Sequence, residues 1–261
     1  MLARLVIRPV SAAPASVAYD RAFRGCRFIS VLAACAAVSQ LSVAQAPPAP
    51  VIPPARFVVV LDAAHGGDDP GARIKGPAGH GPEGQSQAEK TFTLALSVRL
   101  RSLLTARGIQ VVTTRESDTT VDLNRRAEVA NHANARACLS LHAAESGSGI
   151  HLFVSSVAPA EPERFAAWKT AQATSVTRSL ALAGMLNSAL LHAGLAVTLG
   201  RTALPAVDSM TCPAVAVEMA PERGPDKKMV TAGLGNADYH ARVAGALAAA
   251  LLEWQSEARQ P

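Results

Sequence analysis

The chain has 261 residues, of which 49% are apolar and 17% are charged, and this balance excludes a largely disordered chain, a coiled coil and a collagen-like protein. The formal net charge is +5, but five of the 25 basic residues and only one acidic residue lie before residue 47. The remainder carries 20 basic and 19 acidic residues, and the whole chain has only two Tyr and two Trp, so no nucleic-acid-binding surface is expected.

The first 46 residues have the order of residue types that is typical of an export signal. Three arginines (Arg21, Arg24 and Arg27) precede an apolar stretch at 28–38, and small residues follow it. That stretch is shorter than the roughly 20 apolar residues of a membrane-spanning helix, so no transmembrane helix is expected. We therefore predict an exported, periplasmic protein in which 1–46 hold the signal and the start of a proline-rich linker, 47–55 complete the linker, and 56–256 form one folded domain.

Two processing sites fit this signal, and the sequence leaves both open. Cleavage after Ala44, in Ser42-Val43-Ala44-Gln45, would release the protein, whereas Leu32-Ala33-Ala34-Cys35 resembles a bacterial lipoprotein box and would give a lipid anchor at Cys35. After cleavage at Ala44 two cysteines remain, Cys138 and Cys212. In an oxidising compartment they could form a disulfide, or they could stay as buried thiols.

Short apolar runs rich in β-branched residues indicate buried strands, and the run at 57–61 is the first of them. A long loop follows, because 66–84 contains seven glycines and three prolines, and long loops in compact domains tend to be functional. Ser86 and Glu89 have the spacing of a capping box, which predicts a helix from Ser86 to Gly108. Further strands are predicted at 109–113, 137–141, 150–154 and 213–217. Three further helices are predicted: one from Asp122 to about Ala133, a long one that ends before Gly194, and one at about 238–254.

The alternation of buried strands with amphipathic helices predicts an α/β fold: a single three-layer domain with a mostly parallel sheet flanked by helices on both faces. In such sheets, binding and catalysis gather beyond the carboxyl ends of the strands. The runs at 57–61, 137–141 and 213–217 are followed at that position by His65, His142 and Glu218. We therefore expect these three polar side chains to lie near one another.

The two histidines, together with Glu89, would give a zinc ion three protein ligands and leave a fourth position open for water. A structural role remains an alternative for each carboxylate. Glu89 could turn back to the amide of Ser86 in the capping box, and Glu218 could pair with an arginine such as Arg126. The residues alone leave these alternatives open.

Six motifs in chain order resemble those of the zinc-dependent N-acetylmuramoyl-L-alanine amidases, which hydrolyse bacterial peptidoglycan. They cover about residues 57–252 and are Val58-Val59-Val60-Leu61-Asp62-Ala63-Ala64-His65-Gly66-Gly67 with Asp69-Pro70-Gly71-Ala72, Glu89-Lys90, Thr114-Arg115, Leu123-x-x-Arg126-x-x-x-Ala130-Asn131, Ser140-Leu141-His142-Ala143, and Pro213-Ala214-Val215-Ala216-Val217-Glu218. The resemblance implies that 56–256 is the catalytic domain. It implies that His65, Glu89 and His142 bind a Zn²⁺ cofactor and that Glu218 is the catalytic acid/base. The implied substrate is peptidoglycan, which would be cleaved at the amide bond between N-acetylmuramic acid and L-alanine. The motifs do not identify a protein activator.

The chain departs from the family pattern at three places without losing any of these four residues. Ala63-Ala64 replaces the usual Pro-Gly, Ala144 the usual Asn, and Met219-Ala220 the usual Gly-Phe. Two other functions remain open: a zinc peptidase acting on peptidoglycan stem peptides, and a noncatalytic wall-binding protein of the same fold. The sequence has no His-Glu-x-x-His, so the helix-borne site of many zinc proteases is absent.

Two features near the expected site are also assigned from the sequence. His151 follows His142 closely enough to line the cleft, whereas His132 and His192 are expected on the surfaces of their helices. The segment 155–174, with two prolines before a turn that carries Phe165 and Trp168, is expected either to wall the substrate groove or to form a short lid over the zinc.

Overall fold

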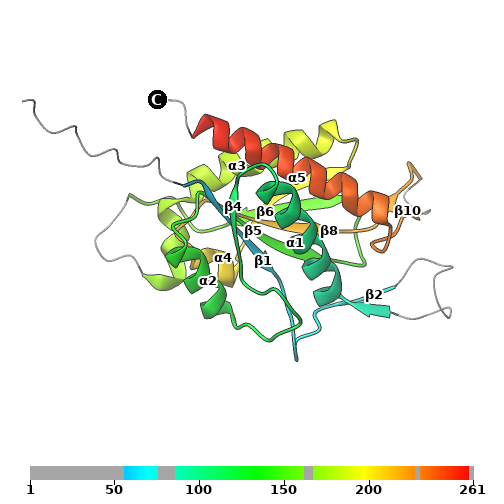
Figure 1. The fold of residues 1–261 in the computed structure, drawn as a ribbon, viewed down its shortest axis with the longest axis horizontal. Helices are drawn as coiled ribbons and strands as arrows, with labels where there is room; N and C mark the ends of the chain where they lie inside the picture. Colours follow the sequence, from blue (N-terminus) through cyan, green and yellow to red (C-terminus); the bar gives the residue numbers. More distant parts are fainter. Residues whose placement is uncertain (1–55, 76–85, 162–166, 227–229, 259–261) are drawn as a thin grey trace, which may run out of the picture. The chain divides into compact units, whose positions relative to one another are not determined.

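A six-stranded sheet with the strand order β4-β1-β5-β8-β6-β7 lies at the centre of the computed structural model of this protein (Figure 1). The structure describes residues 56–75, 86–161, 167–226 and 230–258. The predicted signal and linker, with both processing sites, lie outside the described residues. The strands of the sheet are β1 (Val58–Ala63), β4 (Gln110–Thr113), β5 (Ala137–Ala143), β6 (Ile150–Ser155), β7 (Val197–Thr202) and β8 (Ala214–Met219).

Four of the six strands run in one direction and two run in the other. β4, β1, β5 and β8 pair in parallel, whereas β6 pairs antiparallel with β8, and β7 pairs in parallel with β6. The prediction of a mostly parallel sheet is therefore confirmed. Because β6 is reversed, its carboxyl end lies at the amino end of β8.

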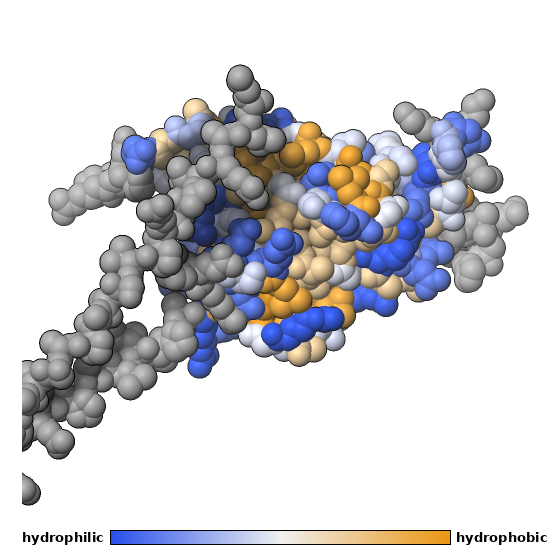
Figure 2. Space-filling model, turned by 90° about the horizontal axis from the view of Figure 1, so that it is seen from above, coloured by the Kyte–Doolittle hydropathy of each residue, from blue (hydrophilic) through white to orange (hydrophobic). Residues whose placement is uncertain are grey.

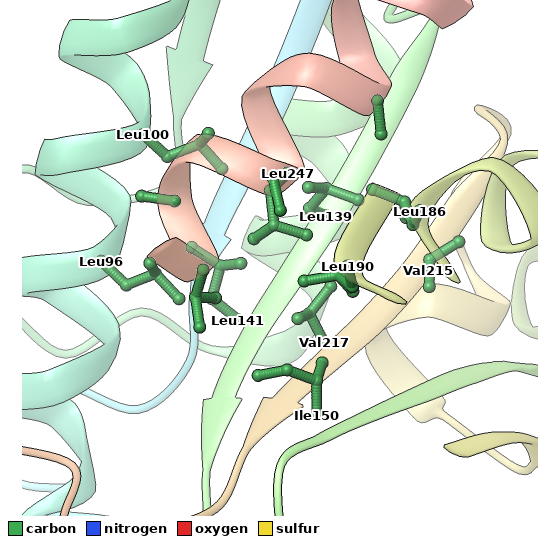
Figure 3. Packing of buried hydrophobic residues seen from close by; sticks show 14 of the residues in the cluster. Leu96, Leu100, Leu139, Leu141, Ile150, Leu186, Leu190, Val215, Val217 and Leu247 are labelled. Atoms are coloured by element: carbon green, nitrogen blue, oxygen red, sulfur yellow. The ribbon is translucent and has the colours of Figure 1, made fainter. Parts of the chain in front are cut away.

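Helices cover both faces of the sheet, which confirms the three-layer α/β prediction. One face carries α1 (Glu89–Thr105), α3 (Val176–His192) and α5 (Ala237–Glu257), and the other carries α2 (Leu123–His132) and the short α4 (Pro205–Asp208). In Figure 1, α1 and α5 cross in front of the sheet. Since both faces are covered, the central strands are apolar along most of their length. Figure 3 shows the larger core, in which leucines of α1, α3 and α5 gather against β5 and β8.

The second face has a smaller core, and this core contains a disulfide. Cys138 of β5 and Cys212, just before β8, are joined, so the structure contains the bonded form of the two that the sequence left open. Toward the carboxyl ends of β1, β5 and β8, this face carries polar side chains instead of apolar ones, among them Asp62, Ser140 and Glu218. The second face is therefore the one that presents the candidate site.

The surface combines hydrophilic and apolar areas. On the face that Figure 2 shows, apolar side chains occupy the middle and hydrophilic ones border them. Leu180 of α3 is 37% exposed, because the buried side of this helix runs through Leu182, Leu186 and Leu190. Within the described ranges, the helices are too short or too polar to cross a membrane.

Helix α1 begins at Glu89, so the capping-box prediction was wrong. Ser86–Ala88 forms β3, which pairs antiparallel with β2 (Arg73–Lys75), and the helix has no side-chain cap. Residues 86–88 are extended because they belong to this hairpin. The Glu89 carboxylate consequently does not accept a hydrogen bond from the amide of Ser86.

The described parts of the segment 155–174 lie at the opposite end of the sheet from the candidate site, so these parts form neither a wall of its groove nor a lid over it. β6 delivers Ser155 to the amino end of β8, opposite to Glu218. In the 3₁₀ segment η1 (Trp168–Thr174), the buried Gln172 donates hydrogen bonds to the carbonyls of Met210 and Cys212 at 2.8 and 3.0 Å. Residues 162–166, including Phe165, are outside the described part.

The remaining elements are the antiparallel pair β9 (Glu222–Arg223) and β10 (Val230–Ala232).

Candidate metal centre

The three residues expected to bind a metal lie together at the carboxyl end of the sheet. His65 follows β1, His142 lies in β5, and Glu89 is the first residue of α1. Their candidate ligand atoms all lie within 4.8 Å of one another: Glu89 Oε2 is 3.1 Å from His65 Nε2, and Glu89 Oε1 is 3.2 Å from His142 Nδ1. Two atoms bound tetrahedrally to a metal at about 2.0 to 2.1 Å are about 3.3 Å apart, so this spacing suits a metal ion.

Glu89 is a buried carboxylate whose two oxygens are both oriented by backbone amides. Oε2 accepts a hydrogen bond from the amide of Ala72, and Oε1 accepts one from the amide of Ala143, both at 3.0 Å. Burial alone would raise the pKa of Glu89, but hydrogen bonds with His142, with His65 and with the two amides lower that pKa far below its ordinary value. Glu89 is therefore ionised, as a metal ligand must be.

His65 is oriented through its other ring nitrogen. His65 Nδ1 lies 2.8 Å from Asp69 Oδ2, and Asp69 Oδ1 accepts a hydrogen bond from the amide of Gly71. The hydrogen bond with Glu89 raises the pKa of His65, burial opposes this, and the hydrogen bond with Asp69 raises the pKa further. Because the carboxylate of Asp69 accepts from Nδ1–H, Nε2 is left to face Glu89 and a metal.

A buried chain of hydrogen bonds orients His142. His142 Nε2 lies 3.3 Å from Ser140 Oγ, and this hydroxyl donates to Asp62 Oδ2 at 2.8 Å. Asp62 Oδ1 in turn accepts hydrogen bonds from Arg126 Nη1 at 2.7 Å and from Thr114 Oγ1 at 2.8 Å. Since the Ser140 hydroxyl hydrogen is directed to Asp62, its oxygen can accept a hydrogen bond from Nε2–H of His142, and the other ring nitrogen, Nδ1, faces Glu89.

Two buried arginines hold the chain where it leaves β1. Arg126 donates to the carbonyls of Ala63 and His65, both at 2.7 Å, and Arg115 donates to the carbonyls of Ala63 and Ala64 at 2.9 and 3.1 Å. Carbonyls buried at the end of a strand need such partners. The same bonds stabilise the bend at which His65 adopts a left-handed φ of 61°.

Gly71 packs directly against two of the candidate ligands. Its φ is 65°, and a Cβ atom placed there would lie 2.6 Å from His65 Cδ2 and 2.7 Å from Glu89 Oε2. Only glycine combines this backbone conformation with this close approach.

Glu218 lies in the same row of the sheet as His142. The register pairs His142 of β5 with Glu218 of β8, and Glu218 with His151 of β6, so the three side chains leave the same face. Glu218 is half-buried and makes no hydrogen bond or ion pair with any residue in the described part of the chain. Pairing of Glu218 with Arg126 is wrong, because Arg126 pairs with Asp62 at 2.7 Å.

The other histidines in the described part of the chain contribute no atom to the metal cluster. His151 is next to Glu218 in the sheet, but its Nδ1 is hydrogen-bonded to Thr198 Oγ1 at 2.5 Å, and its Nε2 is buried near Gly147. His132 and His192 are exposed on α2 and α3, as predicted.

Sequence reasoning assigned no role to Asp62, Asp69 or Ser140, which orient the two histidines. A signal for Asp62 was present, because an acidic residue inside a buried apolar strand requires charged or hydrogen-bonding partners. No comparable signal marked Ser140, since a serine in a strand is common.

Comparison with known proteins identifies the family of this chain. A family model described as N-acetylmuramoyl-L-alanine amidase (Amidase_3) matches residues 59–253. A sporulation-specific N-acetylmuramoyl-L-alanine amidase of Bacillus subtilis (strain 168) is 38% identical over 93 residues, which is 35% of this chain and 32% of the relative. N-acetylmuramoyl-L-alanine amidase AmiA of Escherichia coli (strain K12) is 37% identical over 86 residues, which is 33% of this chain and 27% of AmiA. The matches thus span about a third of the length of these curated relatives.

Solved structures share the fold. The catalytic domain of CwlV, an N-acetylmuramoyl-L-alanine amidase of Bacillus (Paenibacillus) polymyxa var. colistinus, superposes with a TM-score of 0.58 at 26% identity, over 77% of this chain and 98% of that domain. Ami1 of Mycobacterium abscessus, in its apo form, gives a TM-score of 0.56 at 22% identity, over 76% of this chain and 98% of Ami1. Since the family model covers about three quarters of the sequence, the chain belongs to the N-acetylmuramoyl-L-alanine amidase family Amidase_3.

Proposed function

We propose that this chain is a zinc-dependent hydrolase that cleaves the amide bond between N-acetylmuramic acid and L-alanine in peptidoglycan. The observation that carries the proposal is the convergence, at one end of one sheet, of two imidazole nitrogens, a buried carboxylate and the carboxylate of Glu218, which has no partner among the described residues. The names of the sequence relatives support this reaction, although the matches cover only about a third of their length.

The zinc ion would be held by His65 Nε2, His142 Nδ1 and Glu89. Two nitrogens and one carboxylate are a donor set typical of catalytic zinc, which keeps a further position for water or substrate. Zinc supplies Lewis acidity, which polarises a carbonyl and makes water easier to deprotonate. Asp69 and Ser140 fix which nitrogen of each histidine carries the proton, so that the other is free to bind.

Glu218 is the acid/base of the proposed reaction. Because its carboxylate has no partner among the described residues, it is available to accept a proton from the attacking water. The same carboxyl group then donates that proton to the amine nitrogen of L-alanine as the amide bond breaks. A positioned acid/base of this kind typically contributes about 10² to 10⁴ in rate.

Export is part of the proposal, because the substrate lies outside the cytoplasmic membrane. Residues 1–46 would supply the signal, with cleavage after Ala44 or acylation of Cys35 as the two routes, and 56–256 would be the catalytic domain. The Cys138–Cys212 disulfide supports an oxidising compartment such as the periplasm.

The test compares Glu218→Gln and His142→Ala with the wild type on purified peptidoglycan. We expect Glu218→Gln to stay folded and zinc-loaded but nearly inactive, and His142→Ala to lose zinc. Glu253→Gln, on the exposed side of α5, removes the same charge far from the site and should behave as wild type.

Mass spectrometry of the released products identifies the bond that is cut. Amide cleavage gives stem peptides that begin with a free L-alanine amine, whereas a stem-peptide zinc peptidase leaves L-alanine on the glycan. Release of shortened peptides would replace the proposed function with the peptidase, and no release by a zinc-loaded wild type would favour the noncatalytic wall-binding protein.

A further inference from the structure

A hollow of about 540 Å³ lies at the end of the sheet opposite to the metal residues. Arg56 precedes β1, Arg136 precedes β5, and Arg178 lies in the first turn of α3, and all three line this hollow. The described residues that line it include no aspartate or glutamate. Its volume is within the range of small-molecule sites.

Among the described residues, the lining of this hollow gives the three arginines no acidic partner, and Glu257 lines a neighbouring hollow with Arg178 and Trp254. None of the three arginines forms an ion pair with a residue in the described ranges, whereas Arg101, Arg125 and Arg126 each do. Like charges that converge repel one another, so the hollow favours a ligand that carries negative charge.

Two residues at the amino end of α3, the N-cap residue Ser175 and Arg178 of the first turn, line the hollow. Ser175 is the N-cap residue of α3, but its hydroxyl donates to the carbonyl of Thr211 at 2.6 Å and does not cap the helix amides. The first amides of the 17-residue helix α3 are therefore left without a side-chain partner, at the positive end of the helix dipole. Helix amides and guanidinium groups together are a typical arrangement for binding phosphate.

Trp254 holds two of the arginines in place. Arg178 Cζ lies 5.5 Å from the centroid of the Trp254 ring, and Trp254 Nε1 donates to the carbonyl of Arg136 at 2.9 Å. This contact fixes the guanidinium of Arg178 and the backbone of Arg136 before a ligand arrives, which lowers the entropy cost of binding.

From this arrangement we propose that the hollow is a binding site for a phosphate-bearing ligand, separate from the metal centre and independent of the proposed hydrolysis. Two sources share this chemistry: the headgroup of an anionic phospholipid, and a soluble phosphate. Arg56, the first described residue, lies at this end of the domain, so acylation of Cys35, one of the two processing routes, would tether this end to a membrane.

The test measures binding of inorganic phosphate by calorimetry, and binding of vesicles by sedimentation, with phosphatidylcholine alone or mixed with phosphatidylglycerol. The double variant Arg56→Gln/Arg136→Gln keeps the contact between Arg178 and Trp254, and we expect at least about tenfold weaker binding of the anion. Arg99→Gln/Arg107→Gln makes the same charge change on the exposed side of α1 and just after it, and should bind as wild type.

The outcomes separate the sources and can overturn the site. Phosphate binding with selective sedimentation on phosphatidylglycerol assigns a lipid headgroup, and phosphate binding alone assigns a soluble ligand. Arg178→Lys keeps the charge but loses the planar fork, so a phosphate site should weaken in this variant too. The proposal is overturned if the wild type binds neither anion, or if both double variants bind as tightly as each other.

Discussion

Replacement of Gly71 by alanine should damage the metal site more than the fold. The φ of 65° costs a non-glycine residue about 1 to 2 kcal/mol. The added Cβ would also lie 2.6 to 2.8 Å from atoms of His65 and Glu89, whereas non-bonded carbon contacts are optimal at about 3.5 to 4.0 Å. The two ligands must therefore separate by up to about 1 Å, and displacements of this size cost about 10²-fold in turnover. We expect zinc affinity to fall about 10- to 100-fold.

Gly108→Ala is the matched control for backbone strain. Gly108 has a φ of 80°, but an added Cβ would meet no atom within 4 Å. We expect both variants to lose similar stability, measured by denaturant unfolding of the zinc-free protein, and only Gly71→Ala to lose zinc affinity, measured by competition with a chelator. Equal zinc affinity in the two variants would refute the argument that the close approach of Gly71 sets the ligand spacing.

Three further predictions follow from buried groups. Asp62→Asn and Ser140→Ala should each lower zinc affinity about 10- to 100-fold, because they interrupt the chain that orients His142, and a chelator titration in which both match the wild type would contradict this. Burial lowers the pKa of His240, so the unfolded chain binds more protons than the folded protein as the pH falls through about 6.5, and the folded protein loses stability toward acid. Between about pH 7.5 and about pH 5, the thermal midpoint of His240→Gln should therefore drop less than that of the wild type. Replacing both Cys138 and Cys212 by serine opens a loop with a sequence separation of 74 and should lower the free energy of unfolding by roughly 4 kcal/mol, a change that guanidinium titration would fail to find if the disulfide did not form.

The strands, and the clustering of His65, Glu89 and His142, could be predicted because each has a local signal. Apolar runs marked β1, β5 and β8, and the polar residues at their ends marked the site, since parallel strands bring their carboxyl ends to one edge. The direction of β6 had no such signal, because a buried strand has the same composition in either direction. The misplacement of 155–174 follows from that one missing fact.

The capping-box error has a different physical origin. A Ser-x-x-Glu pattern marks a helix start only if its first residue is free, and Ser86 is engaged by β2 through a hairpin whose other strand begins 13 residues earlier. The orientation of the histidines was equally hidden, because Asp62 and Arg126 are 64 residues apart in the chain and meet only after the sheet has formed.

Because β8 pairs with both β5 and β6, the backbone spacing of the sheet sets the distance between Glu218 and His142 at the proposed reaction site. Neighbouring strands are spaced by about 4.8 Å through their backbone hydrogen bonds, so the backbone of Glu218 is one strand spacing from that of His142 whatever the loops do. A slip of one residue in β8 would turn Glu218 into the leucine-rich core on the other face and bring Val217 or Met219 to the metal side. Any error in strand pairing would therefore displace the proposed acid/base from the candidate metal residues. Loop insertions around this site can change what binds without changing the backbone spacing between Glu218 and His142.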